Sequence, residues 1–333
     1  MILFAYGTRP EFIKIKPILD KFKENNIQHK VLFTGQHEDL LDIMPVDYQL
    51  AVIDGYNCHN RLDCVIEAAM NKKNIWKGIT HVLVQGDTTS VLAVALAAFH
   101  RNIKVIHLEA GLRTYNKFNP YPEEINRRIV SQLTDIHLCP TNLNKLNLIS
   151  EKIGGEKHVV GNTILDNLIK YKKDCEYENK VLVTMHRREN HHWLDQWFKE
   201  IDKLAETHID LDFILPLHLN PNVQKYKHLL KNVKVIDPLP HEELIKVLVK
   251  SKMVITDSGG LQEECSFFNK KCLTCRKITE RPEAIDSSTF MVKKPSELKN
   301  IFNEHILDYE INHESPFGDG NSAEKILRII KGL

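Results

Sequence analysis

Residues 253–264 read MVITDSGGLQEE, and this stretch decides the fold class of the chain. Four apolar or β-branched residues are typical of a buried strand, and the small residues behind them are typical of a tight loop that opens into a helix. Residues 81–100 repeat the arrangement, with HVLVQG followed by apolar residues at helical spacing. Strands that alternate with helices predict βαβ units and a parallel sheet.

The alternation continues in both directions and is interrupted once. In the first half we expect strands at residues 2–6, 29–34 and 104–108, with helices after each. The charged, aromatic segment 170–180, KYKKDCEYENK, is typical of a linker, and the alternation resumes with VLVTMH at 181–186. The sequence therefore predicts an α/β protein with two Rossmann-like domains that face each other across a cleft. Their predicted bounds are 1–165 and 166–320, and Ser322 is the expected N-cap of a last helix.

Composition excludes several classes of protein. The 333 residues are 42% hydrophobic and 27% charged, which is close to the globular average. The formal net charge of +1 and the pI near 7.7 do not favour a nucleic-acid binder. No apolar run approaches the roughly 18 residues of a membrane span, and the start MILFAYG lacks the basic region of a signal peptide. Seven scattered cysteines, including the pair Cys272 and Cys275, predict free buried thiols in the cytoplasm.

The loop DSGGLQEE is the clearest candidate for ligand binding. The chain has only 14 glycines, and most of them stand where a predicted strand ends, where backbone must approach a ligand or take a positive φ. Ser258, Gly259 and Gly260 would open a helix whose free N–H groups suit a phosphate. Glu263 or Glu264, one turn later, could accept hydrogen bonds from ribose hydroxyls. The alternative is an ordinary capped turn, and the absent lysine excludes a P-loop.

Polar residues at other predicted strand ends suggest proton transfer beside an anionic group. Arg9 and Lys14 follow the first strand and suit an anion, although Arg9 could instead pair with Glu11 on the surface. Carboxylates at three strand ends, and a histidine flanked by two arginines in the second half, suit general acid–base chemistry. Each also has a structural interpretation. In the order in which the residues are named below, these are a helix N-cap, a buried acceptor for Arg113, a charge at a helix end and an imidazole at a strand end. These four residues are Asp87, Glu109, Glu123 and His186.

No metal site is expected, although the chain has 17 histidines. His186, His191 and His192 cluster in HRRENHH, but no carboxylate follows at the spacing of an HExxH motif. We therefore expect neither a metal nor another cofactor.

Together these loops resemble those of the non-hydrolysing UDP-N-acetylglucosamine 2-epimerases. The shared motifs run in the same order from Gly7 to the segment 316–320: GTRPE, TGQH, QGDTTS, HLEAGLRT, PEEINR, GNTxxD, HRREN, DSGGLQEE, TERPE and PFGDG. The resemblance implies a GT-B fold, with the last helix, residues 321–333, packed on the first domain. It also implies inversion of C2 of a UDP-2-acetamido sugar, by anti elimination of UDP to a 2-acetamidoglucal and re-addition.

The resemblance also assigns roles to individual residues. It implies catalytic roles for Asp87, Glu109, Glu123 and His186, with the order of base and acid left open. The expected partner is a UDP-sugar, without nucleic acid or membrane. We further expect a cytoplasmic homodimer that makes precursors for a surface polysaccharide. The residues expected to contact the UDP-sugar are Arg9, Lys14, Arg113, Ser258, Gly259, Gly260, Glu264 and Arg281.

Three departures from the family pattern leave other functions open. Leu244 stands where the family typically has an aromatic residue on uracil, and His191-His192 replaces a Phe-Gly pair. Glu38 and Asp39 follow TGQH, where a second pyrophosphate would lie, and predict activity without UDP-GlcNAc as an activator. The alternatives are 2-epimerisation of a modified sugar such as a UDP-2,3-diacetamido uronic acid, a GT-B glycosyltransferase, and a catalytically silent nucleotide-sugar binder.

Overall fold

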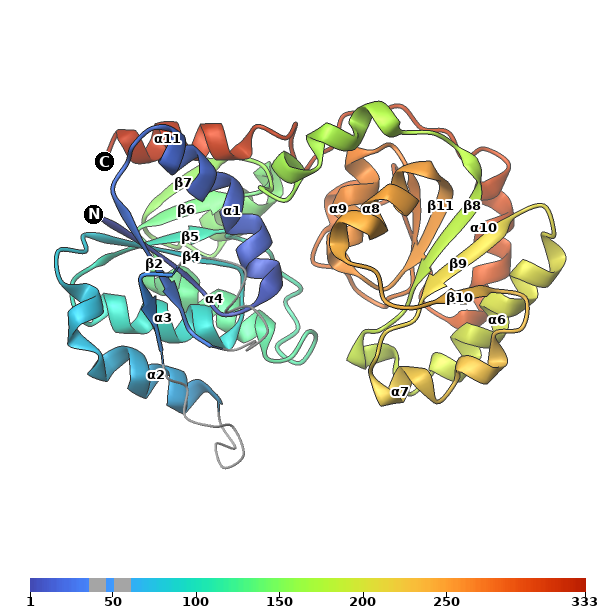
Figure 1. Cartoon of the computed structure of the whole chain (residues 1–333), viewed down its shortest axis with the longest axis horizontal. Helices are drawn as coiled ribbons and strands as arrows, with labels where there is room; N and C mark the ends of the chain where they lie inside the picture. Colours follow the sequence, from blue (N-terminus) through green and yellow to red (C-terminus); the bar gives the residue numbers. More distant parts are fainter. Residues whose placement is uncertain (36–45, 51–60) are drawn as a thin grey trace. The chain divides into compact units, whose positions relative to one another are not determined.

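The computed structural model describes residues 1–35, 46–50 and 61–333. The chain divides into two compact units (Figure 1). Unit 1 contains Met1–Asn167 and Gly320–Leu333, and unit 2 contains Leu168–Asp319. The helix expected after TGQH, together with Glu38 and Asp39, lies outside the described residues.

Unit 1 is built on a parallel sheet, as the alternation of strands and helices predicts. Its strand order is β3-β2-β1-β4-β5-β6-β7, and β1 pairs on one side with β2 and on the other with β4. The sheet therefore reverses its winding beside β1, which is where open α/β sheets bind ligands. The strands are β1 (Ile2–Tyr6), β2 (His29–Phe33), β3 (Tyr48–Gln49), β4 (His81–Gln85), β5 (Lys104–Leu108), β6 (Ile136–Cys139) and β7 (Glu156–Val159).

Helices cover both faces of this sheet because alternate strand residues point to opposite sides. Ile2 and Phe4 of β1 join a core with α1 and α11, whereas Leu3 and Ala5 join a second core with α2 and α3. Figure 1 shows α1 beside α11 and α2 beside α3 on the opposite face. The helices are α1 (Arg9–Glu24), α2 (Arg61–Asn71), α3 (Thr89–Phe99), α4 (Glu123–Leu133), α5 (Asn142–Ser150) and α11 (Ser322–Lys331), with short 3-10 turns η2 (Lys73–Trp76) and η3 (Leu165–Asn167).

Unit 2 repeats the architecture with strand order β10-β9-β8-β11-β12-β13, again parallel. Val181, Val183 and Ile255 pack under α6 and α10, and α8 and α9 contact the sheet from the other face. The strands are β8 (Glu178–Thr184), β9 (Asp212–Pro216), β10 (Lys234–Ile236), β11 (Ser251–Thr256), β12 (Lys271–Thr274) and β13 (Thr289–Met291). The helices are α6 (Leu194–Thr207), α7 (Pro221–Gln224), α8 (His241–Lys250), α9 (Gly259–Phe267) and α10 (Leu298–Ile306), with 3-10 turns η4 (Ile169–Asp174), η5 (Arg188–Asn190), η6 (Lys227–Leu229), η7 (Pro282–Ala284) and η8 (Pro295–Glu297).

The last helix, α11, belongs to unit 1 although it follows unit 2 in the chain. Its apolar residues Ile326 and Leu327 are buried in the same core as α1. The N-cap is Asn321 rather than the predicted Ser322, and it makes no side-chain cap bond. Instead, the Asp166 carboxylate accepts hydrogen bonds from the N–H groups of Ser322 and Ala323, at 3.1 and 2.8 Å. A carboxylate from 156 residues away thus satisfies amides that a local cap would otherwise satisfy.

The segment predicted as a linker, 170–180, is ordered secondary structure. It contains η4 and the first residues of β8, and Tyr171 is buried. The Tyr177 hydroxyl donates to the Asn269 carbonyl at 2.9 Å, and the buried Lys270 ammonium lies 3.8 Å from the centroid of the Tyr177 ring. The sequence prediction was wrong here because charge dominates the composition while the two tyrosines pack inside unit 2.

The expectation of free buried thiols is correct for part of the set. Cys139, Cys265, Cys272 and Cys275 are free and buried, and burial raises the pKa of the Cys139 thiol to about 12. It is wrong for Cys64, which is disulfide-bonded.

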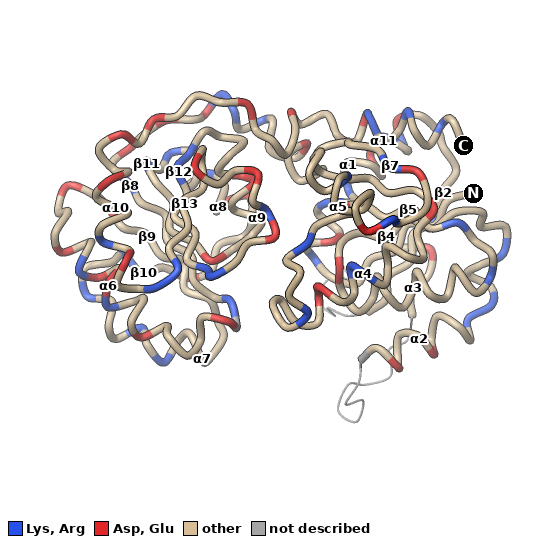
Figure 2. Tube along the Cα trace, turned by 180° about the vertical axis from the view of Figure 1, so that it is seen from behind, with Lys and Arg blue, Asp and Glu red and all other residues tan. Residues whose placement is uncertain are grey.

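Acidic and basic residues are interspersed along both units (Figure 2). None of the described helices is long and apolar enough to cross a membrane.

Candidate active site

Glu109 is the best-anchored carboxylate at the strand exits of unit 1. It directly follows β5, has a φ of +68°, and is only 7% exposed. Its Oε2 accepts hydrogen bonds from Lys14 Nζ at 2.6 Å and from Gln85 Nε2, and Oε1 faces Asn162 Nδ2 at 3.4 Å. The cation and the two amides stabilise a charged carboxylate in a buried place. The structure therefore brings together two predicted site residues, Lys14 and Glu109.

Asp87 lies at the neighbouring strand exit, after Gly86. Gly86 has a φ of +82°, a backbone conformation that favours glycine, and a Cβ added there would lie in ordinary contact with the Glu109 carboxylate, at 4.0 Å. The Asp87 carboxylate accepts from Arg127 Nε at 2.8 Å. Asp87 does not cap α3, as one interpretation suggested, because Thr88 does so by accepting from Val91 N–H. Asp87 therefore has no capping task and is held by an arginine.

Glu123 is the first residue of α4, and this helix contacts the Asp87 loop. One turn later, Asn126 Nδ2 donates to the Asp87 carbonyl at 2.9 Å, and Arg127 bonds both Asp87 and the buried Glu124. These contacts hold the N-terminus of α4 against the Asp87 loop. Glu124, which the sequence did not single out, accepts from the N–H groups of the loop before α4.

The GTRPE segment is built differently from the surface pair suggested by its sequence. Glu11 is 2% exposed and accepts from the N–H groups of Gly7 at 2.5 Å and Thr8 at 3.1 Å. It also accepts from Thr88 Oγ1 at 2.5 Å. Burial raises the pKa of Glu11 to about 7, although these hydrogen bonds oppose the shift. Arg9 is exposed, and the suggested pairing with Glu11 is therefore wrong.

Arg113, a predicted contact of the UDP-sugar, is buried and paired within unit 1. Its side chain has no exposed surface. Both Nε and Nη2 donate to the Glu151 carboxylate at 2.9 Å, and Nη2 also donates to Ser131 Oγ at 3.0 Å. Glu109 is held by Lys14 instead of serving as the Arg113 acceptor that the sequence suggested. Residues 38 positions apart form this pair, and no sequence spacing indicates it.

In unit 2, a fully buried carboxylate organises two strand exits. Asp257 follows β11, and its oxygens accept from the N–H groups of His186 at 3.1 Å and Arg187 at 2.9 Å. They also accept from Asn190 Nδ2 at 3.1 Å, which in turn donates to the Cys275 carbonyl. The HRREN loop is thereby fixed to the start of the DSGG loop. Asp257 belongs to the DSGGLQEE motif, but the sequence did not predict that it binds the backbone of the HRREN loop.

His186 lies beside this carboxylate. Its Nδ1 lies 3.8 Å from Asp257 Oδ1, and its ring stacks on that of His218 with centroids 5.4 Å apart. Burial lowers the pKa of His186, and the nearby His218, Arg187 and His191 add to this, while Asp257 opposes it. A neutral imidazole can accept a proton and return it near neutral pH. His218, which contacts His186, was not predicted as a site residue from the sequence.

The N-terminus of α9 presents its first amides without a side-chain cap. Ser258 is the N-cap but makes no side-chain cap hydrogen bond in the described structure. A Cβ at Gly259 would lie 2.6 Å from Arg281 Nη1 and 2.8 Å from Glu280 Oε1, so only glycine lets these groups approach the helix start. Free N–H groups at a helix N-terminus suit an anion.

Behind α9 runs a buried chain of alternating charges. Arg281 Nε donates to Glu263 Oε1 at 2.6 Å, and its Nη1 donates to Glu280. Arg276, whose side chain has no exposed surface, bonds Glu280 at 2.8 Å and Glu189 of the HRREN loop at 2.7 Å. Arg281 therefore lies beside the helix start. Arg276 and Glu280, which sequence reasoning missed, tie it to the HRREN loop.

α9 carries a second carboxylate, Glu264, which makes no hydrogen bond with Arg281 among the contacts of the described residues. It is 4% exposed, and its Oε1 bonds His241 Nε2 at 2.9 Å. Its buried Oε2 has no hydrogen-bond partner among the described residues. Glu264 thus has one oxygen held and one available to a donor.

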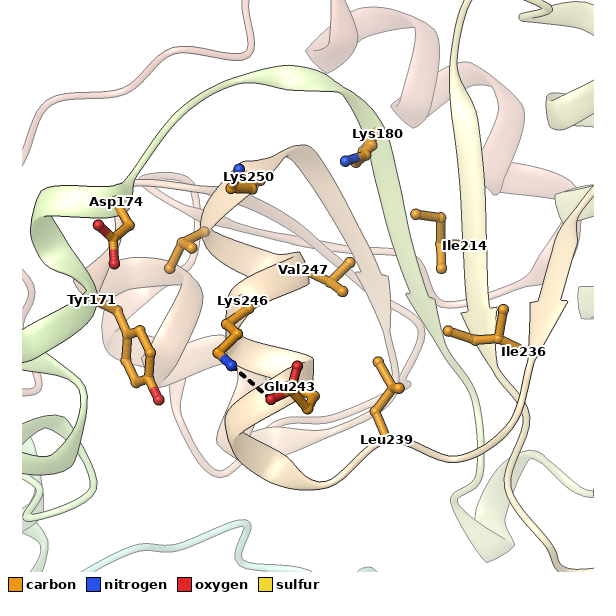
Figure 3. A pocket seen from close by; sticks show the side chains of 11 residues that line it. Tyr171, Asp174, Lys180, Ile214, Ile236, Leu239, Glu243, Lys246, Val247 and Lys250 are labelled. Carbon is orange, nitrogen blue, oxygen red and sulfur yellow. Dashed lines mark hydrogen bonds and ion pairs between the residues drawn. The ribbon is translucent and has the colours of Figure 1, made fainter.

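Unit 2 also has a cavity of about 480 Å³ that none of the predicted site residues lines. Figure 3 shows α8 carrying Glu243, Lys246 and Val247 along one side of it. Its lysines have carboxylate partners, such as Glu243 for Lys246 at 2.7 Å. Over the described ranges, no group of three or more His, Cys, Asp or Glu side chains is arranged to hold a metal ion.

Known proteins share this architecture and sequence over the whole chain. The family model for UDP-N-acetylglucosamine 2-epimerase matches residues 20–331. The UDP-N-acetylglucosamine 2-epimerase of Campylobacter jejuni is 39% identical, over 99% of this chain and 97% of that protein. The UDP-GlcNAc 2-epimerase of Neisseria meningitidis, solved bound to UDP-GlcNAc, superposes with a TM-score of 0.89 at 33% identity over 100% of both chains. The enzyme of Methanocaldococcus jannaschii, solved with UDP-GlcNAc and UDP, gives 0.81 at 29% identity, over 100% of this chain and 99% of that one.

These matches confirm the predicted fold class and the predicted family. The two parallel α/β units are the Rossmann-like domains of a GT-B fold. Matching extends far beyond the motif loops, since the family model spans nearly the entire chain. The chain belongs to the non-hydrolysing UDP-N-acetylglucosamine 2-epimerases, a family of isomerases.

Proposed function

We propose that this enzyme interconverts UDP-GlcNAc and UDP-ManNAc by inverting C2 of the sugar. In the first step a base removes the C2 proton while the C1–O bond to UDP breaks, which leaves 2-acetamidoglucal and UDP. In the second step a proton returns to the opposite face of C2 and UDP adds back to C1. The products then contain every atom of the substrate, and neither an oxidant nor a reductant is required.

The strand-exit groups support the proton transfers. Removal and return of a proton on opposite faces of C2 require two groups, one on each face. Asp87 and Glu109 lie at adjacent strand exits, held by Arg127 and Lys14 respectively. Glu123 begins the helix that bonds the Asp87 loop. His186, whose pKa is lowered by burial, would serve as a further proton carrier.

Unit 2 supports the binding of the leaving group. UDP leaves as a pyrophosphate ester whose developing charge must be stabilised. The uncapped amides at Ser258, Gly259 and Gly260 would bind its phosphates, with Arg281 beside the helix start. Glu264 would accept a ribose hydroxyl at its available oxygen. Arg9 and Lys14 of unit 1 are further proposed contacts of the UDP-sugar.

The observation that carries this proposal is the coincidence of two features. The chain is similar over its full length to UDP-GlcNAc 2-epimerases, and it has anchored carboxylates at adjacent strand exits of unit 1. A plain nucleotide-sugar binder would not need those carboxylates. We further propose that the enzyme is a cytoplasmic homodimer and that its product feeds a surface polysaccharide.

Incubation of the purified enzyme with UDP-GlcNAc in EDTA, followed by proton NMR, tests the proposal. We expect UDP-ManNAc to accumulate to equilibrium without free UDP. Conversion of only a UDP-2,3-diacetamido uronic acid from a panel of UDP-sugars would instead identify the modified-sugar epimerase. Stoichiometric release of UDP on addition of a sugar acceptor would indicate a glycosyltransferase and would overturn the proposal.

A further inference from the structure

We propose that His241 is a positioning residue for nucleotide recognition. In this account it holds the Glu264 carboxylate so that the second oxygen receives a hydrogen bond from a ribose hydroxyl of UDP. The inference rests on the proposed function, because it assumes that α9 binds UDP. It goes further by naming the residue that orients the ribose acceptor, which the sequence did not single out.

The contact joins two helix starts that are far apart in the chain. His241 is the first residue of α8, directly after Pro240, and Glu264 lies 23 residues later in α9. His241 Nε2 lies 2.9 Å from Glu264 Oε1, and the two side chains are 27% and 5% exposed. With Nε2 as the donor, the bond fixes the rotation of the carboxylate and so determines where Oε2 points.

Glu264 has the properties of an acceptor that awaits a donor. Its Oε2 is buried and has no hydrogen-bond partner among the described residues, an arrangement that costs free energy until a donor arrives. A carboxylate accepts hydrogen bonds and repels phosphate. Of the groups in UDP, the ribose hydroxyls are suitable donors, while the phosphates match the amides at the start of the same helix.

The neighbouring carboxylate is excluded from this role. Glu263 accepts from Arg281 Nε at 2.6 Å and is fully buried. The residue pattern alone left open whether Glu263 or Glu264 contacts the ribose, and the family resemblance implied Glu264. The arginine on one and the histidine on the other resolve this choice in favour of Glu264.

Titration calorimetry with two ligands tests the proposal. UDP has both ribose hydroxyls, whereas 2′,3′-dideoxy-UDP has neither. We expect His241→Leu to weaken UDP binding about 3- to 10-fold, as for the loss of one hydrogen bond, and to leave binding of the dideoxy ligand unchanged. His241→Gln, which keeps an N–H donor, should restore most of the UDP affinity. The exposed His228→Leu serves as the matched control and should bind both ligands like the wild type.

A double-mutant cycle and a fold check complete the experiment. If His241 acts through Glu264, then His241→Leu should have no further effect on UDP affinity in a Glu264→Gln background. Thermal unfolding of each variant reports whether it folds. Equal losses for UDP and the dideoxy ligand, or no loss for either, would overturn the role of His241. If the wild-type enzyme bound no UDP at all, the proposed function itself would fail.

Discussion

Two helices of unit 1 that follow strand exits, α1 and α3, begin differently from α9 of unit 2. In unit 1, Thr8 caps α1 and Thr88 caps α3, each by accepting an N–H from the first turn. In unit 2, Ser258 stands at the corresponding place before α9 and makes no side-chain cap bond in the described structure. Thr8 and Thr88 each satisfy an amide of their own helix, whereas α9, like α4 in unit 1, begins without a side-chain cap.

The charged groups divide in the same way. Unit 1 places carboxylates beside single cations, such as Glu109 with Lys14, which suits the transfer of protons. Unit 2 uses its arginines to brace its own loops, as Arg276 does between Glu189 and Glu280. On this difference we base the proposal that unit 1 supplies the carboxylates for proton transfer and that unit 2 supplies the helix start for the phosphates.

The largest effect should come from the proton-transfer groups. We expect each of four substitutions to lower kcat by about 10²–10⁴-fold, because each replaces a titratable side chain with an amide of similar size. They are Asp87→Asn, Glu109→Gln, Glu123→Gln and His186→Asn. UDP affinity should change far less. Rapid-quench assays and calorimetry measure the two quantities. The matched control is Glu67→Gln, on the exposed face of α2. A variant with near-normal turnover would remove its residue from the catalytic set.

Glu11 should make the stability of the protein depend on pH. Its pKa is raised from 4.5 to about 7, so between these values the folded protein keeps a proton that the unfolded chain has lost. Below about pH 4.5 the protein therefore has the full contribution of Glu11 to its stability. As the pH rises to about 7 and beyond, this contribution is lost, and the unfolding free energy falls by roughly 3 kcal/mol.

Urea unfolding of the wild type and of Glu11→Gln at pH 5 and pH 8 measures this effect. Glutamine cannot lose a proton in this range, so the difference in unfolding free energy between the two proteins should shift in favour of Glu11→Gln as the pH rises. The same difference at both pH values would show that Glu11 does not titrate as described.

An acidic residue at the start of α9 should raise the stability of the protein and weaken its binding of UDP. Ser258→Asp would cap the helix and is expected to raise the unfolding free energy by about 0.5–1 kcal/mol. The added charge would occupy the proposed phosphate position and should weaken UDP binding by about 10-fold. Thr141→Asp, at the capped start of α5, is the control for a cap change in unit 1. Unchanged UDP affinity in Ser258→Asp would contradict phosphate binding at this helix.

The smallest effect concerns the caps alone. Thr141 accepts from Asn144 N–H and completes a capping box, so Thr141→Ala should lower the unfolding free energy by about 1 kcal/mol. Ser258→Ala removes no cap bond and should change it by less than about 0.5 kcal/mol. Chemical denaturation resolves the two values, and equal losses would contradict the described difference between the units.

Local patterns predicted the fold and most of the strand-exit loops. Apolar runs followed by small residues locate the strands, because periodicity and turn residues are properties of neighbouring positions. The burial of Glu11 was also accessible, since Thr8-x-x-Glu11 has the spacing of a capping box. That signal was present, and the surface pairing with Arg9 was the wrong interpretation of it.

Contacts between distant segments were not accessible in this way. Asp257 bonds the His186 loop across 71 residues, and Arg276 bonds Glu189 across 87. Arg113 was assigned to the ligand because it lies in a motif, although its partner Glu151 holds it inside unit 1. Sequence patterns identify which loops meet at a sheet edge, but the tertiary packing decides which side chains face a ligand and which face each other.

Proton NMR of the reaction in D₂O tests the central claim most directly. If carboxylates of unit 1 remove the C2 proton and solvent exchanges with it, UDP-ManNAc formed from UDP-GlcNAc should contain deuterium at C2 from the first turnover. Glu109→Gln should bind UDP and incorporate deuterium at least 10²-fold more slowly. Formation of UDP-ManNAc that keeps the original C2 proton, or deuterium incorporation at the wild-type rate in Glu109→Gln, would contradict the account.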